Sequence, residues 1–157
     1  MGIDPGFDRL GWAVGTFKAN QWSNLHFGCI QTAKKDALYE RFKQLNQEFA
    51  HLVALYQPTE AALESLFFIH NQSTAFAVSQ ARGVVLASLL PVVQIIADFT
   101  PLQVKQSVTG FGKADKSAVA KMVRVELQLG NQPIIDDAFD ALAVMITQGA
   151  AGRIARL

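Results

Sequence analysis

Four acidic side chains, three of which end or interrupt short apolar runs, restrict the possible folds more than any other feature of the chain. They are Asp4, Glu64, Asp137 and Asp140. A carboxylate placed near a core costs free energy unless a cation pairs with it. Converging acids also repel one another, and Mg²⁺ or Mn²⁺ with oxygen ligands relieves both costs. The pattern therefore predicts a fold that gathers these acids around divalent ions, as in a two-metal phosphodiesterase acting on nucleic acid.

The length and composition indicate one globular domain. The chain has 157 residues, half of them apolar, which suffices for one core. We expect a single domain over residues 1–157, with about 150–157 as a frayed tail. The single cysteine, Cys29, excludes an internal disulfide framework, is expected to be a small buried residue, and fits a reducing compartment. No apolar run is long enough to span a bilayer and no signal peptide opens the chain, so we expect a cytoplasmic protein without membrane contact.

The periodicity of apolar residues predicts an α/β fold. Short connections between the first strands favour antiparallel pairing, and helices between the later strands favour parallel pairing. The expected architecture is a mixed five-stranded sheet with helices on both faces. Gly110 and Gly112 predict a mobile loop. The expected strands are Gly2 to Asp4, Trp12 to Phe17, Leu25 to Ile30, Ala61 to Leu66 and Val92 to Ala97, and the expected helices are Leu38 to Leu52, Gln72 to Leu90, Pro101 to Val108, Asp115 to Leu129 and Asp136 to Gln148.

The predicted elements bring the acids toward one edge of the sheet. Parallel strands collect functional groups at their carboxyl ends, where Asp4 and Glu64 lie. Asp137 and Asp140 are three residues apart and share a helix face, but Asp136 and Asp140, four apart, do so as well. Spacing alone leaves the choice between Asp136 and Asp137 open, and one of them would suit the helix start, where an acid is favoured.

Basic side chains are concentrated in one stretch. The net charge is only +1, but neutralising four of the 13 acids with metal ions would leave 14 basic side chains against nine acids. Helical spacing places Lys113, Lys116, Lys121 and Arg124 within an arc of roughly 140°. We expect this face to bind DNA phosphates without base specificity, although on charge alone a solvated helix face is the better explanation. The stretch contains the single acid Asp115 and these basic residues: Lys105, Lys113, Lys116, Lys121 and Arg124.

Six motifs, in order along nearly the whole chain, resemble the RuvC family of Holliday-junction resolvases, which have the ribonuclease H-like fold. Each motif alone is weakly specific, but the ordered set is strongly specific. The motifs are Gly2-Ile-Asp-Pro-Gly6, Glu64 ahead of Phe67-Phe68, Ser79-Gln-Ala-Arg-Gly83, Pro101-Leu-Gln-Val-Lys-Gln106, Val108-Thr-Gly-Phe-Gly-Lys-Ala-Asp-Lys116 and Asp137-Ala-Phe-Asp-Ala-Leu142.

The resemblance implies metal-dependent cutting of four-way DNA junctions. It makes Asp4, Glu64, Asp137 and Asp140 the ligands of two Mg²⁺ ions per site, with Mn²⁺ able to substitute, and so selects Asp137 over Asp136. Paired metals would activate a water for in-line attack on phosphorus, leaving 5′-phosphate and 3′-hydroxyl ends. The matching lysines Lys105 and Lys116 would act beside the scissile phosphate as further catalytic residues.

The resemblance also implies contacts with DNA. Phe67, with Phe68 as the other candidate, would stack on an unpaired base near the junction centre. His70 stands where related proteins often carry a lysine. The full set of expected DNA-binding residues is Phe67, Phe68, His70, Arg82, Lys113, Lys121 and Arg124.

The helix expected from Gln72 to Leu90 is apolar on all sides around Val84 to Ala87. Such a helix must bury both faces, either inside one monomer or partly against a second copy. The resemblance implies a homodimer, whose two equivalent sites would suit two symmetric cuts in a four-way junction. It also raises a RuvA/RuvB-type branch-migration complex as a partner.

Three other functions compete with this interpretation. A ribonuclease H-like nuclease for other branched or hybrid nucleic acids would share the acids and differ in its dimer. A noncatalytic junction-binding protein would gain nothing from four repelling carboxylates. Actin-like sugar or acyl kinases also open with a Gly-Ile-Asp-x-Gly strand, but they need two such domains and a far longer chain.

Overall fold

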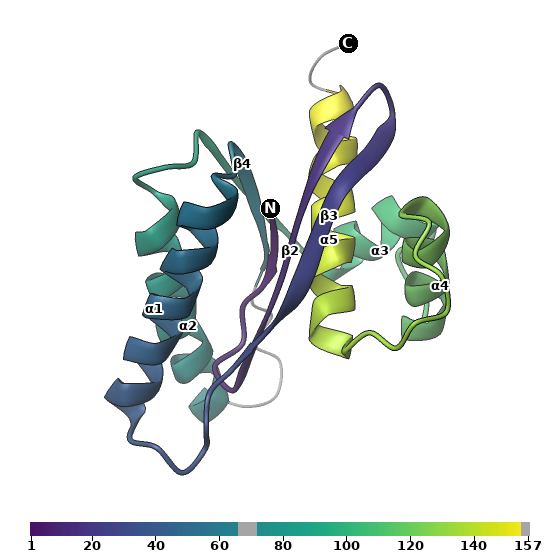
Figure 1. The fold of residues 1–157 in the computed structure, drawn as a ribbon. Coiled ribbons are helices and arrows are strands. Elements are labelled where there is room, and N and C mark those ends of the chain that lie inside the picture. Colours follow the sequence, from purple (N-terminus) through teal and green to yellow (C-terminus); the bar gives the residue numbers. More distant parts are fainter. Residues whose placement is uncertain (66–71, 155–157) are drawn as a thin grey trace.

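The computed structural model describes residues 1–65 and 72–154, which form five strands and five helices (Figure 1). The three amino-terminal strands are connected directly, and each later strand is preceded by a helix. The elements are β1 (Gly2–Asp4), β2 (Arg9–Lys18), β3 (Gln21–Gln31), α1 (Leu38–Tyr56), β4 (Glu60–Glu64), α2 (Gln72–Leu89), β5 (Ile95–Phe99), α3 (Pro101–Thr109), α4 (Lys116–Glu126) and α5 (Asp136–Ile154).

The strands form one mixed sheet in the order β3-β2-β1-β4-β5. The strand β1 lies at its centre, antiparallel to β2 and parallel to β4. The strands β2 and β3 pair as a long antiparallel hairpin, and β5 adds to β4 in parallel. This topology confirms the predicted sheet of antiparallel strands followed by parallel ones.

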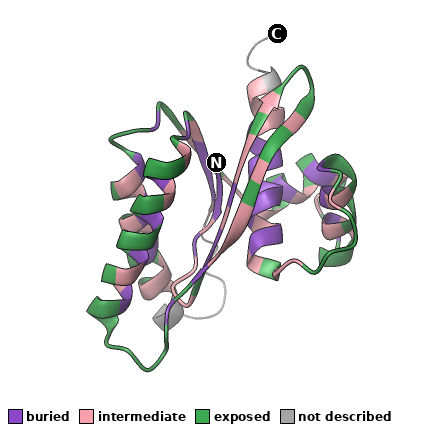
Figure 2. Ribbon diagram, viewed as in Figure 1, coloured by how far each residue is buried: buried purple, intermediate pink, exposed green. Residues whose placement is uncertain are grey.

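Helices cover both faces of the sheet, and each face has its own apolar core (Figures 1 and 2). Ile3 and Leu63 point to the face covered by α1 and α2 and are fully buried there. Ala13 and Ala62 point to the opposite face, where α5 packs on the sheet with α3 and α4 outside it. Because side chains alternate along a strand, the buried residues of the sheet are divided between the two cores.

Local sequence signals explain where the helices begin. Thr100 and Gln103 form a capping box at the start of α3, with Pro101 in its first turn. Asp115 accepts a hydrogen bond from the backbone N–H of Ala118, 2.7 Å away, so the single acid of the basic stretch is the N-cap of α4. Within the described ranges, no helix is both long and apolar enough to cross a membrane.

Two predicted elements differ from the observed ones. The buried strand predicted from Val92 to Ala97 is wrong in place and burial, because β5 lies at Ile95–Phe99 on the sheet edge with Ile95 half exposed. The backbone N–H of Val93 instead donates to the carbonyl of Leu89, which keeps this stretch in a turn after α2. The last helix continues past the predicted end at Gln148 to Ile154, into the stretch expected to be frayed.

Candidate active site

The first two predicted site acids lie side by side at the carboxyl ends of neighbouring strands. Ile3 of β1 is in register with Leu63 of β4, so the next residues on the two parallel strands are Asp4 and Glu64. Successive side chains alternate between the faces of a sheet. Asp4 therefore shares the face of Gly2, which contacts α5, and Glu64 shares the face of Ala62. Both acids are directed to the α5 side.

Two glycines let α5 lie directly on the strand backbones. A Cβ atom added to Gly2 would lie 2.3 Å from the carbonyl oxygen of Ala141, and one added to Gly11 would lie 1.9 Å from the carbonyl oxygen of Asp137. Gly11 is also the register partner of Asp4. The backbone contact at Gly11 thus places the start of α5, with Asp137 and then Asp140, beside Asp4.

The acids perturb one another electrostatically. The pKa of Asp4 is raised to about 7, first by burial and then by the charges of Glu64, Asp140 and Asp137. Burial and then Asp140 raise the pKa of Glu64. The pKa of Asp140 is raised by burial, against the opposing effect of Lys116. The fold therefore places Glu64, Asp137 and Asp140 near enough to Asp4 for their charges to raise its pKa.

Three cations lie beside these acids. The Nζ atom of Lys116 is 3.2 Å from an Oδ2 of Asp140, and the guanidinium of Arg9 is 3.5 Å from Oδ2 of Asp137. Lys105, on α3, lowers the pKa of Glu64 by its charge. Lys105 and Lys116 were predicted for this site, whereas Arg9 was missed because an Arg following a turn carries no sequence signal of a carboxylate partner.

Asp136 and Asp137 have different environments. The side chain of Asp136 is 76% exposed and lies 3.4 Å from Lys116. The side chain of Asp137 is 21% exposed and its charge acts on Asp4. The geometry therefore favours Asp137 as the acid that faces the strands, and Asp136 as an exposed residue of the first helical turn.

The donor atoms suit a hard divalent cation. All four acids offer carboxylate oxygens, the ligands that Mg²⁺ and Mn²⁺ prefer, and a cation would relieve the repulsion that raises their pKa values. In the described part of the chain, no three Asp, Glu, His or Cys side chains form a group that could hold a metal ion. Asp137 and Asp140 instead pair with Arg9 and Lys116. The residues fit the ions by donor type and charge, and metal binding would compete with these two ion pairs.

Comparison with known proteins identifies the family. The family model described as crossover junction endodeoxyribonuclease RuvC matches residues 1–148. This chain belongs to the RuvC family. A RuvC protein from Petrotoga mobilis is 39% identical over 149 residues, covering 95% of this chain and 91% of the relative. One from Thermosipho melanesiensis is 43% identical over 144 residues, covering 92% of each.

A solved RuvC structure has the same fold. The structure of Thermus thermophilus RuvC in complex with a Holliday junction substrate superposes with a TM-score of 0.90 at 32% identity, covering 98% of this chain and 94% of that one. The match confirms the ribonuclease H-like RuvC architecture that the sequence motifs implied.

The predicted DNA-contact residues that the structure describes differ in their exposure and in the contacts that their side chains make. Lys113 precedes the N-cap of α4, so the helical arc proposed for it does not apply, although Lys113 and Lys121 are both exposed. Arg124 donates to the carbonyl of Gln132 at 2.9 Å and lies over the ring of Phe139 at 4.8 Å, which holds the connection between α4 and α5. Three further predicted contacts, Phe67, Phe68 and His70, lie outside the described residues.

Arg82 also points inward. Its side chain is 17% exposed, pairs with Asp98 of β5 and donates to the carbonyl oxygen of Glu64, 3.3 Å away. These contacts hold the end of β4 at the point where Glu64 enters the site. In this structure Arg82 supports the strand end that carries Glu64, and its contact with DNA stays a prediction.

The loop after Asp4 is held by a buried arginine that sequence reasoning missed. Arg41 of α1 donates from Nε to the hydroxyl of Thr32 at 2.9 Å and pairs with Asp8. Its guanidinium lies 3.7 Å from the centre of the Phe7 ring. Hydrogen bonding to Arg41 and then Lys34 lowers the pKa of Asp8. These contacts attach the turn between β1 and β2 to α1. They therefore stabilise the position of the strand end that carries Asp4.

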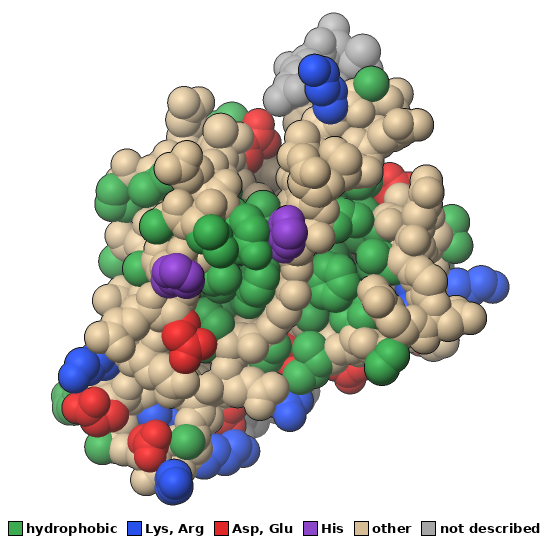
Figure 3. All heavy atoms as spheres, in the orientation of Figure 1, with side chains coloured by type: hydrophobic (Ala, Val, Ile, Leu, Met, Phe, Trp, Pro, Cys, Tyr) green, Lys and Arg blue, Asp and Glu red, His purple; other side chains and the backbone are tan. Residues whose placement is uncertain are grey.

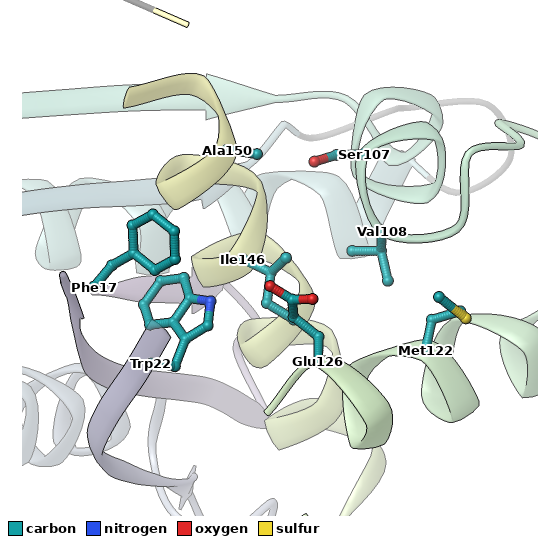
Figure 4. Close-up of a pocket in the computed structure, with 8 residues that line it drawn as sticks. All are labelled: Phe17, Trp22, Ser107, Val108, Met122, Glu126, Ile146 and Ala150. Atoms are coloured by element: carbon teal, nitrogen blue, oxygen red, sulfur yellow. The ribbon is translucent and has the colours of Figure 1, made fainter. Parts of the chain in front are cut away.

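Two pockets in the described part of the chain lie apart from the four acids. A pocket between the β2–β3 hairpin, α3, α4 and α5 is shown in Figure 4. A second groove, lined by both polar and apolar residues, lies between the end of α1, the hairpin and α5, at the Met1 end of β1. Figure 3 shows the surface of the molecule from the side of α1 and the hairpin. Neither pocket includes any of the four acids, which lie on a more open surface where Asp140 is 36% exposed. The lining of the first pocket is Phe17, Trp22, Ser107, Val108, Met122, Glu126, Ile146 and Ala150.

Proposed function

We propose that this protein resolves four-way DNA junctions by hydrolysing phosphodiester bonds with two divalent metal ions. The observation that carries the proposal is the convergence of Asp4, Glu64, Asp137 and Asp140 in a RuvC-family fold. A relative with 32% identity and the same fold has been solved with a Holliday junction substrate. The endonuclease activity follows from membership of a family named for cutting crossover junctions.

Each charged group has a proposed role in this reaction. Asp4, Glu64, Asp137 and Asp140 hold two Mg²⁺ ions, for which Mn²⁺ substitutes. Bound ions would supply Lewis-acid stabilisation of the charge that develops during hydrolysis. Lys116 is 61% exposed and can turn from Asp140 toward a phosphate, and Lys105 approaches the site from α3. Both lysines attract the phosphate and stabilise negative charge as it forms.

Exposed lysines outside the acids extend the proposed DNA surface. Lys113 and Lys121 are exposed on the α3–α4 side of the molecule. Phosphate contacts by such lysines would give salt-sensitive affinity without base preference. Phe67, Phe68 and His70 stay predicted contacts near the junction centre. A cytoplasmic location, favoured by the single cysteine, and a RuvA/RuvB-type partner belong to the same proposal.

The proposal is tested by incubating the protein with a labelled four-way junction, a linear duplex and an RNA–DNA hybrid. Each substrate is tested with Mg²⁺, with Mn²⁺ and with chelator. We expect paired symmetric nicks in the junction alone, lost in chelator, with ends that ligase can reseal because they carry 5′-phosphate and 3′-hydroxyl groups.

Other outcomes would favour the competing functions. Cutting of the hybrid or of a flap would keep the metal chemistry and change the substrate. Tight junction binding without cutting under any metal would leave a binding protein and contradict the assignment of the four acids.

The outer face of α2 supports the proposed homodimer. The helix buries Ala81, Val85 and Leu89 against its own sheet layer. The residues Phe76, Gly83, Ala87 and Leu90 are exposed. Their spacings of seven, four and three residues place the first three in one stripe along α2, and Leu90 continues it. Phe76 is 75% exposed and Leu90 68%. A second copy covering this stripe would bury its apolar side chains, and Gly83 and Ala87 would let the two helices approach closely.

Replacing Ala87 by Arg is expected to convert the dimer to a monomer. A buried, unpaired guanidinium at a helix contact costs several kcal/mol. Light scattering coupled to gel filtration would report the mass, and a cruciform plasmid would report whether the two nicks remain paired. Ala50→Arg, on an exposed position of α1, is the matched control. A dimer that persists in Ala87→Arg would exclude this face as the interface.

A further inference from the structure

Phe111 is an exposed aromatic side chain on the loop that joins α3 to α4. It is 61% exposed, although burying a Phe side chain is favourable by about 1.5–3 kcal/mol. A single exposed apolar residue is common on protein surfaces and has no meaning by itself. Phe111 differs because its backbone is held in place on both sides and because the loop connects two helices of the candidate active site.

The loop predicted to be mobile is crossed by side-chain hydrogen bonds. The amide of Gln106 donates to the carbonyl of Gly110 at 2.7 Å and accepts from the N–H of Gly112 at 2.9 Å. The hydroxyl of Thr109 accepts from the N–H of Phe111 at 3.1 Å and donates to its carbonyl at 3.0 Å. Gly110, at φ 77°, ends α3 in the left-handed conformation. The backbone of Phe111 is therefore ordered while its ring remains in solvent.

Lysine residues precede and follow Phe111 in the sequence, as a contact with the phosphates of a nucleotide strand would require. The helix before the loop carries Lys105, which acts on Glu64, and the helix after it begins at Lys116, which pairs with Asp140. Lys113 is exposed two residues beyond Phe111. Lysines on both sides of an aromatic ring offer contacts to consecutive phosphates and to the base between them.

We propose that the ring of Phe111 stacks on a nucleobase of the DNA strand whose phosphate lies at the acid site. The inference rests on the proposed function, because it needs DNA at the four acids. Stacking on an aromatic ring tolerates any base, since each base presents a π-face. An ordered loop loses little further conformational entropy on binding, which favours such a contact. Phe111 would thus hold the nucleotide beside the scissile phosphate.

The test compares Phe111→Ala, Phe111→Trp and Phe111→Leu, with Tyr39→Ala as the control at an 82% exposed aromatic residue of α1. Junction affinity is measured by fluorescence anisotropy in chelator. A junction carrying 2-aminopurine beside the cutting site reports stacking through quenching. We expect Phe111→Ala to weaken junction binding by roughly 5- to 150-fold and to lose the quenching, as removal of a base–aromatic stack does. Phe111→Trp should retain both signals, and Tyr39→Ala should match the unaltered protein.

Three results would overturn the inference. Unaltered affinity and quenching in Phe111→Ala would show that the ring stays in solvent. Full rescue by Phe111→Leu would show a general apolar contact instead of stacking. A lower unfolding midpoint in Phe111→Ala, with the affinity loss reversed by cooling, would show a structural role. Failure of the proposed function is distinguishable, because the unaltered protein would then fail to cut the junction, whether or not it binds it.

Discussion

Replacing Asp4 by Asn is expected to abolish junction cleavage, to preserve junction binding, and to stabilise the metal-free protein. The substitution removes a proposed metal ligand at the centre of the sheet, so cleavage should fall by at least about 10³-fold, or about 4 kcal/mol in the activation barrier. Binding should persist because lysines supply the phosphate contacts. The gain in stability is expected because Asn removes a carboxylate whose charge is disfavoured by burial and by the neighbouring acids.

The effect on stability depends on pH in a defined direction. Burial, with Glu64, Asp140 and Asp137, raises the pKa of Asp4 from 3.8 in the unfolded chain to about 7 in the folded one. Between these values the folded state binds the proton more tightly, so the ionised carboxylate destabilises the fold increasingly as the pH rises and fully above about 7. The Asn variant carries no such penalty. Its free energy of unfolding in chelator at pH 8 should exceed that of the unaltered protein by about 2–4 kcal/mol.

Urea unfolding in chelator at pH 8 and pH 5, with cleavage and binding assays, would check both effects. The stability difference should shrink at pH 5, where the carboxyl group of Asp4 is protonated in the folded protein. Asp36→Asn, at an exposed acid that is not among the charges acting on Asp4, should leave stability and cleavage unchanged. Loss of junction binding together with cleavage, or a less stable Asn variant at pH 8, would show that Asp4 has a structural role.

Replacing Gly11 by Ala is expected to destabilise the protein and to remove cleavage. The new Cβ would lie 1.9 Å from the carbonyl oxygen of Asp137, far inside van der Waals contact with a backbone atom. The start of α5 must then move away from the sheet and carry Asp137 and Asp140 away from Asp4. We expect a loss of about 1–3 kcal/mol or more in stability and at least about 10²-fold in cleavage, since displacements of 1 Å have such effects.

Gly130→Ala is the matched control, because a Cβ at Gly130 would meet nothing within 4 Å. Urea unfolding would measure stability, and cleavage would be measured at a temperature where both variants remain folded. A Gly11→Ala protein that folds and cuts as well as the control would refute the claim that this backbone contact places the helix acids.

The strand acids were predictable because they depend on local patterns. Asp4 and Glu64 follow short apolar runs, and the pairing of β1 with β4 brings such ends together in parallel. The choice between Asp136 and Asp137 was not predictable from spacing, because both share a face with Asp140. It depends on where α5 contacts β2, and that contact is made at Gly11 by backbone atoms that no charge or hydropathy pattern represents.

The arginines show a second limit of sequence reasoning. Arg82 and Arg124 lie in motifs or charge clusters that favour DNA contact, yet both donate to backbone carbonyls, of Glu64 and of Gln132. Every residue has a backbone carbonyl, so the sequence does not indicate which carbonyl accepts a hydrogen bond from an arginine. An arginine that stabilises a loop therefore cannot be distinguished by sequence from one that binds phosphate. The same reason explains the Gly110–Gly112 loop, whose order comes from side-chain contacts of Gln106 and Thr109.

The helix α5 carries two of the four acids, and it also supplies many of the side chains of one hydrophobic core. From Ala138 onward its residues are largely buried against the sheet, α3 and α4, while Asp137 and Asp140 lie in its first turns. Within the described residues, the helix runs without a break from these proposed metal ligands into the packed interior. Heat inactivation should therefore coincide with global unfolding, and sequence changes deep in the α5 core should appear as changes in cutting rate before they appear as loss of soluble protein.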